Sequence, residues 1–351
     1  MSAAVEIDGR CEARFAAVRA AFAANFAAGR EVGASFAATV DGVPVVDLWG
    51  GHIDAARSRP WQRDTIVNLF STTKAITALC AHVLVERGLL DVDAPVARYW
   101  PEFAEHGKGG IAVRHVLSHS AGLAALRRPL PTEALFDWER MVAALAAETP
   151  WWEPGSVSGY HAMTFGHLVG ELIRRLTGLT PGAFCRQVIT EPLGADFHIG
   201  LPAMEDGRVA DMVVPSHEEN AAAGAAIDPE SLLGKVLGNP PLRPELANTR
   251  AWRAAEIPPP TGMAMPGRWL GSWPRSPAAA RSTACGCSQP RPWNGRFASS
   301  RTAATWCSAS RCAGDSATCW RAPSCRSGPT RAPSATAGGA DRWRSRISTR
   351  A

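Results

Sequence analysis

The stretch "NLFSTTKAITAL", Asn68 to Leu79, places a serine three residues before a lysine at the start of an apolar run. Three residues make just under one helical turn, so Ser71 and Lys74 project from the same face of a helix. The apolar residues that follow predict a buried helix that ends near Gly88. Lys74 is therefore expected inside the protein rather than on its surface.

The choice of lysine at position 74 is itself informative. The chain contains three lysines, Lys74, Lys108 and Lys235, against 34 arginines. Lysine can shift its pKa and take part in proton transfer, whereas arginine stays charged. A serine hydroxyl is a weak nucleophile until a neighbouring base takes its proton. The pair therefore predicts nucleophilic catalysis by Ser71 with Lys74 beside it, although a capping serine and an ordinary lysine would give the same spacing.

The length and composition indicate a large globular protein. With 351 residues, 46% of them hydrophobic, the chain can form one large domain or two interleaved ones around a sizeable core. Apolar runs are too short for a membrane span, so we expect no membrane contact. The N-terminal residues lack the pattern of a signal peptide, which predicts a cytoplasmic location.

Charge and cysteine content divide the chain into two unlike parts. Residues 1–263 carry 23 basic and 30 acidic side chains, a net charge of −7, whereas residues 264–351 carry 14 arginines and two acids, a net charge of +12. Cys11, Cys80 and Cys185 are scattered through the first part, as in a protein of a reducing compartment. The other six cysteines lie in the second part. We therefore treat residues 1–263 as the catalytic region and residues 264–351 as an anomalous tail.

The tail shows neither a helical nor a strand period, and it contains one leucine and no valine. A disordered basic tail that binds nucleic acid would explain its charge. Six tryptophans and six cysteines are unusual for such a tail, so we expect no nucleic-acid partner. A zinc site is a further interpretation, but no C-x-x-C pair occurs.

We predict instead that the tail is frameshifted. One base added to codons chosen for Met263 to Gly271 encodes M-G-N-A-R-A-L-A-R, which is a good helix former. The same shift can restore a His-Gly-Gly within Arg331 to Ser345. A reading-frame change therefore explains the composition of the tail better than a site or a binding segment does.

Periodicity along residues 1–263 predicts a mixed fold. A hairpin is expected over residues 33–53, with its turn at Asp41-Gly42. Helices are expected over residues 10–28, 71–90 and 135–150, within 154–178, and after residues 111 and 181. These elements predict an α/β fold of the α+β type. It has an antiparallel sheet that starts with the hairpin and is flanked by helices, and a mostly helical region over about residues 90–250.

Three further segments follow Lys74 in close order: "LLDVDAPVARYWPEF", "IAVRHVLSHSAGL" and "PGSVSGYHAMTFGHLVGELIRRLTG". With Ser71-Thr72-Thr73-Lys74 they resemble the serine β-lactamase-like superfamily, which includes class C β-lactamases, D-Ala-D-Ala peptidases and family VIII carboxylesterases. The resemblance covers roughly residues 10–263. Ser71 to Lys74 matches the first motif, Tyr160 matches the tyrosine of the second, and "LSHSAGL" (Leu117–Leu123) matches a structural segment. It implies a β-lactamase/transpeptidase-like fold whose sheet is completed by the C-terminal part of the chain, here the scrambled tail.

The resemblance implies acyl transfer in two steps. Ser71 Oγ attacks an ester or amide carbonyl, Lys74 and Tyr160 share the proton transfers, and water then releases the acid. The resemblance also implies an oxyanion hole, formed by the Ser71 backbone N–H and by one N–H on the strand after the third motif.

Two departures from the superfamily pattern bear on activity and substrate. Tyr160-His161-Ala162 lacks the Asn of the β-lactamase motif Tyr-x-Asn. This favours an esterase for short acyl chains over the alternatives, a β-lactamase or a D-amino-acid peptidase. The third motif, Lys/His-x-Gly, is absent, and no histidine occurs after His217. A catalytically impaired homologue is therefore a further alternative.

Other candidate residues surround this constellation. Trp151 and Trp152 are predicted to line the acyl pocket, with plain core packing as the alternative, and His161 is assigned to substrate binding with them. His115, His119, His161 and His167 could supply a base or metal ligands, but each is expected to be structural or to support the residues of the site from behind. We expect no metal and no cofactor, and a small-molecule ester as the partner. The sequence leaves the oligomeric state open.

Overall fold

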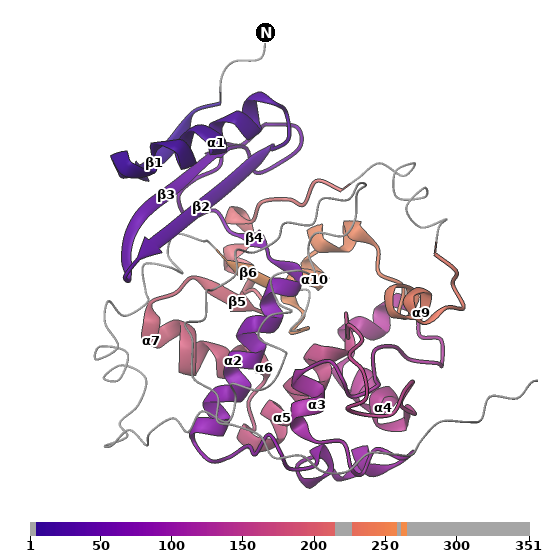
Figure 1. Ribbon diagram of the computed structural model, residues 1–351. Helices are drawn as coiled ribbons and strands as arrows, with labels where there is room; N and C mark the ends of the chain where they lie inside the picture. The colour runs from indigo at the N-terminus through magenta and orange to yellow at the C-terminus, as the bar shows by residue number, and fades with distance from the viewer. Residues whose placement is uncertain (1–4, 215–226, 258–260, 265–351) are drawn as a thin grey trace, which may run out of the picture. The chain divides into compact units, whose positions relative to one another are not determined.

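Residues 5–214, 227–257 and 261–264 are described by the structure, a computed structural model (Figure 1). The chain divides into two compact units, residues 1–293 and 294–351, and every described residue belongs to the first unit. Apart from Ala264, the segment predicted to be frameshifted lies outside the described residues.

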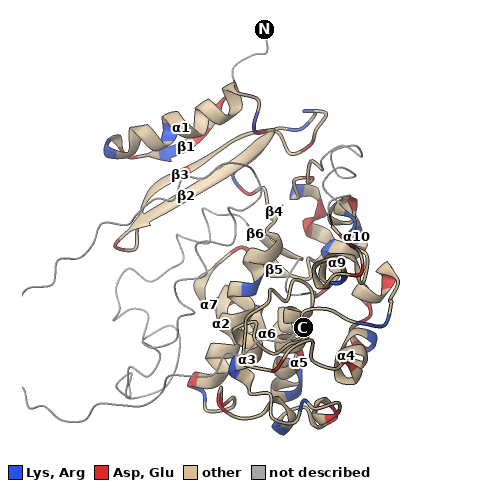
Figure 2. Ribbon diagram, turned by 45° about the vertical axis from the view of Figure 1, so that its right-hand side comes forward, with Lys and Arg blue, Asp and Glu red and all other residues tan. Residues whose placement is uncertain are grey.

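The first sheet is antiparallel and contains β1 (Ile7–Cys11), β3 (Val43–Gly51) and β2 (Gly33–Val40), in that order. The predicted hairpin is confirmed, because Val40 pairs with Val43 across a turn in which Asp41 and Gly42 have φ values of 50° and 74°. Positive φ at both central residues is the type I′ geometry that Asp-Gly favours. β2 carries no charged side chain (Figure 2).

Helix α1 (Ala16–Ala27) begins later than the sequence predicts. A 3₁₀ turn at Ala13–Phe15 precedes it, and residues 7–11 form strand β1. The prediction of a helix from residue 10 is wrong at this end, because the short strand is mostly exposed and shows no alternating apolar pattern. α1 lies along the sheet in Figure 1, and Phe22 packs against the buried cluster that contains Leu48 of β3.

The remaining helices surround a second, larger core. They are α2 (Thr73–Glu86), α3 (Val113–Leu117), α4 (Trp138–Ala147), α5 (Thr164–Thr177), α6 (Pro181–Cys185), α7 (Glu191–Leu193), α9 (Leu232–Gly238) and α10 (Arg250–Ala254). In α5 every residue from Thr164 to Ile173 is buried. Cys80 and Leu84 of α2 belong to the same core cluster as Phe165 of α5. α2 and α5 therefore form the centre on which the candidate site is built.

Helices α2, α4 and α5 confirm three of the predicted helices, with shorter bounds. Gly88 and Gly178 follow the ends of α2 and α5 with φ values of 70° and 72°. This left-handed conformation stops a helix, and glycine adopts it without steric cost. Between about residues 90 and 250 the described elements are helical except for β5 (Phe197–Ile199). No helix within the described ranges is long and apolar enough to cross a membrane.

A second antiparallel sheet was not predicted from the sequence. It contains β4 (Val67–Asn68), β6 (Gly262–Ala264) and β5, in that order. Leu69 N donates to Gly262 O at 2.8 Å. A Cβ on Gly262 would lie 2.0 Å from Thr73 Oγ1, so a residue without a side chain is needed there. The sheet therefore holds β6 against the first turn of α2.

Candidate active site

The chain reaches Ser71 through a residue with strained backbone geometry. Phe70 has a φ of 44°, which bulky residues rarely adopt and which costs roughly 1–3 kcal/mol. Its N–H donates to Asn68 Oδ1 at 3.2 Å, and its ring meets the edge of Trp252 at a centroid distance of 6.3 Å. These contacts present Ser71, exposed, on the 3₁₀ turn Phe70–Thr72 that leads into α2.

Lys74 is buried at the centre of the candidate site, as the sequence predicts. Its Nζ lies 3.0 Å from Ser71 Oγ and 3.0 Å from Tyr160 Oη. No carboxylate forms an ion pair with it in the part of the chain that the structure describes. Burial lowers the pKa of Lys74 to about 7, because the charged ammonium loses its hydration. The neutral form of Lys74 is then accessible near neutral pH, and a neutral amine can accept a proton.

Tyr160 lies within hydrogen-bond distance of Lys74, as Ser71 does. Its side chain is half exposed, and the Lys74 ammonium lies 4.7 Å from its ring centroid. Partial burial raises the pKa of Tyr160, and a hydrogen bond with Ser71 opposes this rise. Tyr160 therefore keeps its proton at neutral pH, where Lys74 releases its own. The two groups next to the serine are suited to opposite tasks, one as a base and the other as an acid.

The structure places His161 beside Tyr160 but with its ring directed into the protein. The side chain is fully buried, Nε2 accepts from Leu123 N at 3.1 Å, and Nδ1 lies 2.6 Å from Gly159 O. Burial lowers the pKa of His161 to about 4. Because both ring nitrogens have backbone partners, this geometry favours support of Tyr160 over contact with a substrate.

The two tryptophans contact different segments of the chain. Trp152 Nε1 donates to Val157 O at 3.0 Å, and the ring meets His161 edge-on at 5.9 Å. Trp151 instead donates to Ala125 O at 2.8 Å and stacks under the Arg127 guanidinium at 4.0 Å. The structure thus brings Trp152 to the loop that carries Tyr160, whereas Trp151 contacts a neighbouring segment.

Three residues near the site have roles that the sequence alone did not predict. Asn68 and Phe70 set the backbone before Ser71, and His119 packs against the Tyr160 ring at a centroid distance of 5.2 Å. His119 lies in "LSHSAGL", the segment that matches the superfamily, so a sequence signal for it existed. For Phe70 no signal existed, because positive φ is uncommon for a bulky residue.

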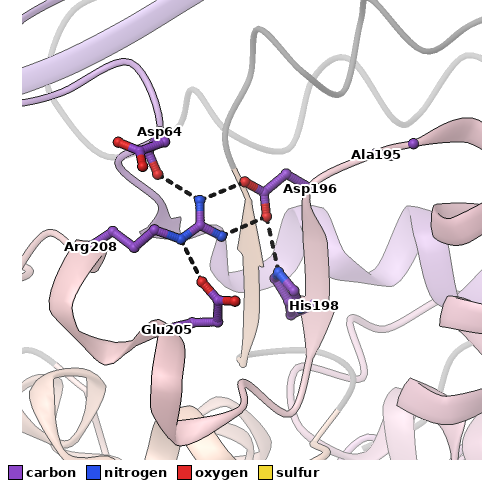
Figure 3. A pocket seen from close by; sticks show the side chains of 7 residues that line it. Asp64, Ala195, Asp196, His198, Glu205 and Arg208 are labelled. Atoms are coloured by element: carbon purple, nitrogen blue, oxygen red, sulfur yellow. Dashed lines mark hydrogen bonds and ion pairs between the residues drawn. The ribbon is translucent and has the colours of Figure 1, made fainter.

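A cavity of about 500 Å³ lies elsewhere and is lined by Asp64, Gly194, Ala195, Asp196, His198, Glu205 and Arg208 (Figure 3). Arg208 donates to both Asp196 carboxylate oxygens, at 2.7 and 2.9 Å, and to Glu205 at 2.6 Å. Burial alone would raise the pKa of Asp196, but hydrogen bonds from His198 and Arg208 outweigh this effect and lower it. Ser71, Lys74 and Tyr160 are not among the lining residues, so this ion-pair network is separate from the candidate catalytic group.

The described residues were also compared with the side-chain groupings that bind metal ions. No group of three or more His, Cys, Asp or Glu side chains is arranged there to hold a metal ion. His115, His119, His161 and His167 are not arranged with further ligands in this way.

Comparison with known sequences places the chain in a family. The sequence matches the Beta-lactamase family over residues 18–343, and the chain belongs to this family. The resemblance read from the sequence is thereby confirmed. The matched range includes most of the segment predicted to be frameshifted, and the reading-frame hypothesis stays a prediction.

Curated relatives include two esterases by name. "Esterase/beta-lactamase LipL" of Mycobacterium tuberculosis (strain ATCC 25618 / H37Rv) is 41% identical over 221 residues, which are 62% of this chain and 50% of that protein. "Esterase EstB" of Burkholderia gladioli is 30% identical over 185 residues, which are 48% of this chain and 46% of that protein. The matched part thus spans about half the length of these relatives.

Solved structures show the same fold. A family VIII carboxylesterase is 47% identical with a TM-score of 0.67, and the match covers 74% of this chain and 68% of that one. A penicillin-binding protein homologue from Caulobacter crescentus is 42% identical with a TM-score of 0.66 and the same coverage. The predicted β-lactamase/transpeptidase-like architecture is therefore confirmed.

Proposed function

We propose that this protein is a serine hydrolase that cleaves carboxylic esters of short acyl chains through an acyl-enzyme. One observation carries the proposal: the buried Lys74 Nζ lies 3.0 Å from both Ser71 Oγ and Tyr160 Oη. A neutral amine at this distance can remove the serine proton, which is the activation that a hydroxyl nucleophile needs. The names of the two curated relatives and of the carboxylesterase structure support ester hydrolysis.

In the first half-reaction, Ser71 Oγ attacks the ester carbonyl while its proton passes to Lys74 Nζ. The bond between the carbonyl carbon and the alcohol oxygen then breaks, and the leaving oxygen takes a proton from Tyr160 Oη. Lys74 returns the proton to Tyr160 across their 3.0 Å contact. The alcohol thus leaves with the proton of Tyr160, the serine proton replaces it on Tyr160, and the acyl group stays on Ser71.

In the second half-reaction, water attacks the acyl carbon and gives its proton to the Lys74–Tyr160 pair. The acyl–oxygen bond breaks, the acid leaves, and Ser71 regains a proton from Lys74. The negative charge on the carbonyl oxygen needs a nearby donor in both steps. The Ser71 backbone N–H, in the 3₁₀ turn that leads into α2, is our candidate for one such donor.

The residue two positions after Tyr160 supports esters over β-lactams. Ala162 is partly buried and packs into an apolar cluster with Leu135, Met163 and Ile257. The position therefore offers no side-chain amide to a substrate. Trp152 beside the Tyr160 loop supplies an apolar wall, which suits a short acyl chain.

A serine-directed fluorophosphonate tests which residue is the nucleophile. Two chromogenic substrates, an ester and a β-lactam, test the class of substrate. We expect one label per full chain, its loss in Ser71→Ala, and a higher kcat/KM for p-nitrophenyl butyrate than for nitrocefin. A label that persists in Ser71→Ala would place the nucleophile elsewhere. A preference for nitrocefin would favour a β-lactamase, and neither label nor turnover in the wild type would indicate an impaired homologue.

A further inference from the structure

Tyr160 sits on an irregular loop, so its position depends on the residues beside it. Residues 157–161 belong to neither a helix nor a strand, and α5 begins only at Thr164. The Tyr160 side chain is 50% exposed, so packing around the ring covers only part of it. Yet its hydroxyl lies within hydrogen-bond distance of Lys74. Contacts to the backbone on either side of Tyr160 must therefore fix the hydroxyl.

His119 makes two of these backbone contacts. Its carbonyl oxygen accepts from Gly159 N at 3.0 Å, and its Nδ1 accepts from His161 N at 3.2 Å. It therefore binds the residue before Tyr160 and the residue after it. To make both bonds, His119 adopts a φ of 59°, in the left-handed region that few residues with a side chain occupy. Its ring also packs against Tyr160 and Phe165, at centroid distances of 5.2 and 4.9 Å.

His161 ties the same loop to the segment that contains His119. Its Nε2 accepts from Leu123 N, so Nδ1 carries the ring proton and donates it to Gly159 O at 2.6 Å. Leu123 lies four residues after His119. Gly159 therefore has its N–H held by His119 and its carbonyl held by His161, while the N–H of His161 is held by His119.

Both histidines must be neutral for these bonds, because Nδ1 of His119 and Nε2 of His161 act as acceptors. Burial is the main reason that the pKa of His119 falls to about 3 and that of His161 to about 4. The positive charge of Lys74 lowers the pKa of both histidines further. Each imidazole ring would also repel the other if both were charged. The bonding pattern and the surroundings therefore agree on uncharged rings.

We propose that His119 and His161 are positioning residues that clamp the backbone on both sides of Tyr160 and so hold its hydroxyl on Lys74. The inference rests on the proposed function, in which Tyr160 Oη passes a proton to the leaving alcohol. Neither histidine touches the reacting atoms in this scheme. Loss of the clamp should lower kcat much more than it changes KM, because it acts on proton transfer and not on binding of the ester.

Two substitutions at position 119 separate the clamp from simple packing. His119→Leu keeps the bulk of the side chain but removes Nδ1, the acceptor of the bond from His161 N. Displacement of the Tyr160 hydroxyl should then lower kcat about 10²-fold, with KM within about threefold of wild type. In His119→Asn the amide oxygen can replace Nδ1, and asparagine tolerates positive φ, so kcat should recover to within about fivefold of wild type. His167→Leu is the control, because this histidine is fully buried in α5 and bonds to Met163, the residue before that helix, and not to the Tyr160 loop. Its kcat should stay near wild type.

A double-mutant cycle shows whether the clamp acts through the Tyr160 hydroxyl. In a Tyr160→Phe background, His119→Leu should have almost no further effect on kcat, since the group it positions is gone. Losses that multiply would overturn the proposal, as would a His119→Leu enzyme with wild-type kcat. If His119→Leu does not fold, His119→Gln takes its place in the cycle, because its amide oxygen sits one bond too far out.

A titration of Tyr160 keeps the clamp testable even if the ester assay fails. The chain has two tyrosines, Tyr99 and Tyr160, so the ultraviolet difference between wild type and Tyr160→Phe isolates the ionisation of Tyr160. Release of the ring into solvent in His119→Leu should lower its raised pKa towards the ordinary value of about 10. An unchanged Tyr160 titration in His119→Leu would overturn the clamp. An inactive wild type with this shift present would overturn the proposed function alone.

Discussion

Lys74 Nζ lies 3.0 Å from Tyr160 Oη, although 86 positions separate the two residues in the sequence. Ser71 reaches Lys74 by local helix geometry, but Tyr160 reaches it only through the packing of α2 on α5 and through the loop before α5. The fold therefore brings Tyr160, the proposed acid, next to a serine–lysine pair that the local sequence already contains.

Lys74 should not tolerate arginine. Lys74→Arg and Lys74→Ala should each lower kcat/KM for p-nitrophenyl butyrate by about 10²–10⁴-fold, because neither side chain can act as the base. Lys235→Arg serves as the control, since this lysine pairs with Glu230 at 2.8 Å outside the site. A Lys74→Arg enzyme with near wild-type turnover would rule out proton transfer by Lys74.

Ester hydrolysis should weaken as the pH falls below about 7. Lys74 acts in its neutral form, so protonation at acidic pH removes the base, and kcat/KM should fall about tenfold per pH unit. His119 and His161 titrate lower, at about 3 and about 4, and the pKa of Tyr160 is raised, so none of them interferes between pH 5 and 9. A flat pH profile over this range would contradict the low pKa of Lys74.

The burial of Lys74 should also cost stability in a pH-dependent way. Its pKa is about 7 in the folded protein and 10.5 when unperturbed. Between these values the unfolded chain binds a proton that the folded one lacks, so folded-state stability rises with pH there. The penalty is complete below about pH 7. Lys74→Met should therefore raise the melting temperature by a few degrees at pH 6 and by less at pH 10. A gain that is the same at both pH values would argue against this linkage.

The close approach of β6 to α2 predicts a specific steric coupling. Gly262→Ala should lower the free energy of unfolding by about 1–3 kcal/mol, because the new Cβ would lie 2.0 Å from Thr73 Oγ1. Thr73→Ala in the same chain should recover most of that loss. Gly207→Ala is the control, since a Cβ there meets nothing within 4 Å. Denaturant unfolding of the wild type, the two single variants, the double variant and the control measures the coupling, and additive losses at positions 262 and 73 would contradict it.

The features that could be predicted from the sequence are the ones set by neighbours along the chain. The i, i+3 spacing of Ser71 and Lys74, the Asp41-Gly42 turn and the glycines that end α2 and α5 all depend on local hydrogen bonding and sterics. Tyr160 could be named only through the resemblance to a family, because its contact with Lys74 is long-range.

The features that escaped prediction depend on pairing across the chain. β4, β5 and β6 are two or three residues long and pair across long stretches of sequence, so none of them shows a strand period of its own. β1 is short and mostly exposed, and the predicted helix was extended over its end. His161 was assigned to the substrate by its place next to Tyr160, whereas its two backbone partners come from Leu123 and Gly159. Sequencing the gene across the codons for Met263 to Gly271 decides the reading-frame prediction.

Trapping the acyl-enzyme tests directly whether Ser71 is the nucleophile. The full chain is mixed with p-nitrophenyl butyrate, quenched in acid within the first turnovers, digested and examined by mass spectrometry. We predict one butyryl group on the peptide that carries Ser71, and none on that peptide in Ser71→Ala. Turnover of the ester with a butyryl group on another residue, or with no covalent adduct in repeated quenches, would contradict the central claim that Ser71, activated by Lys74, is the nucleophile.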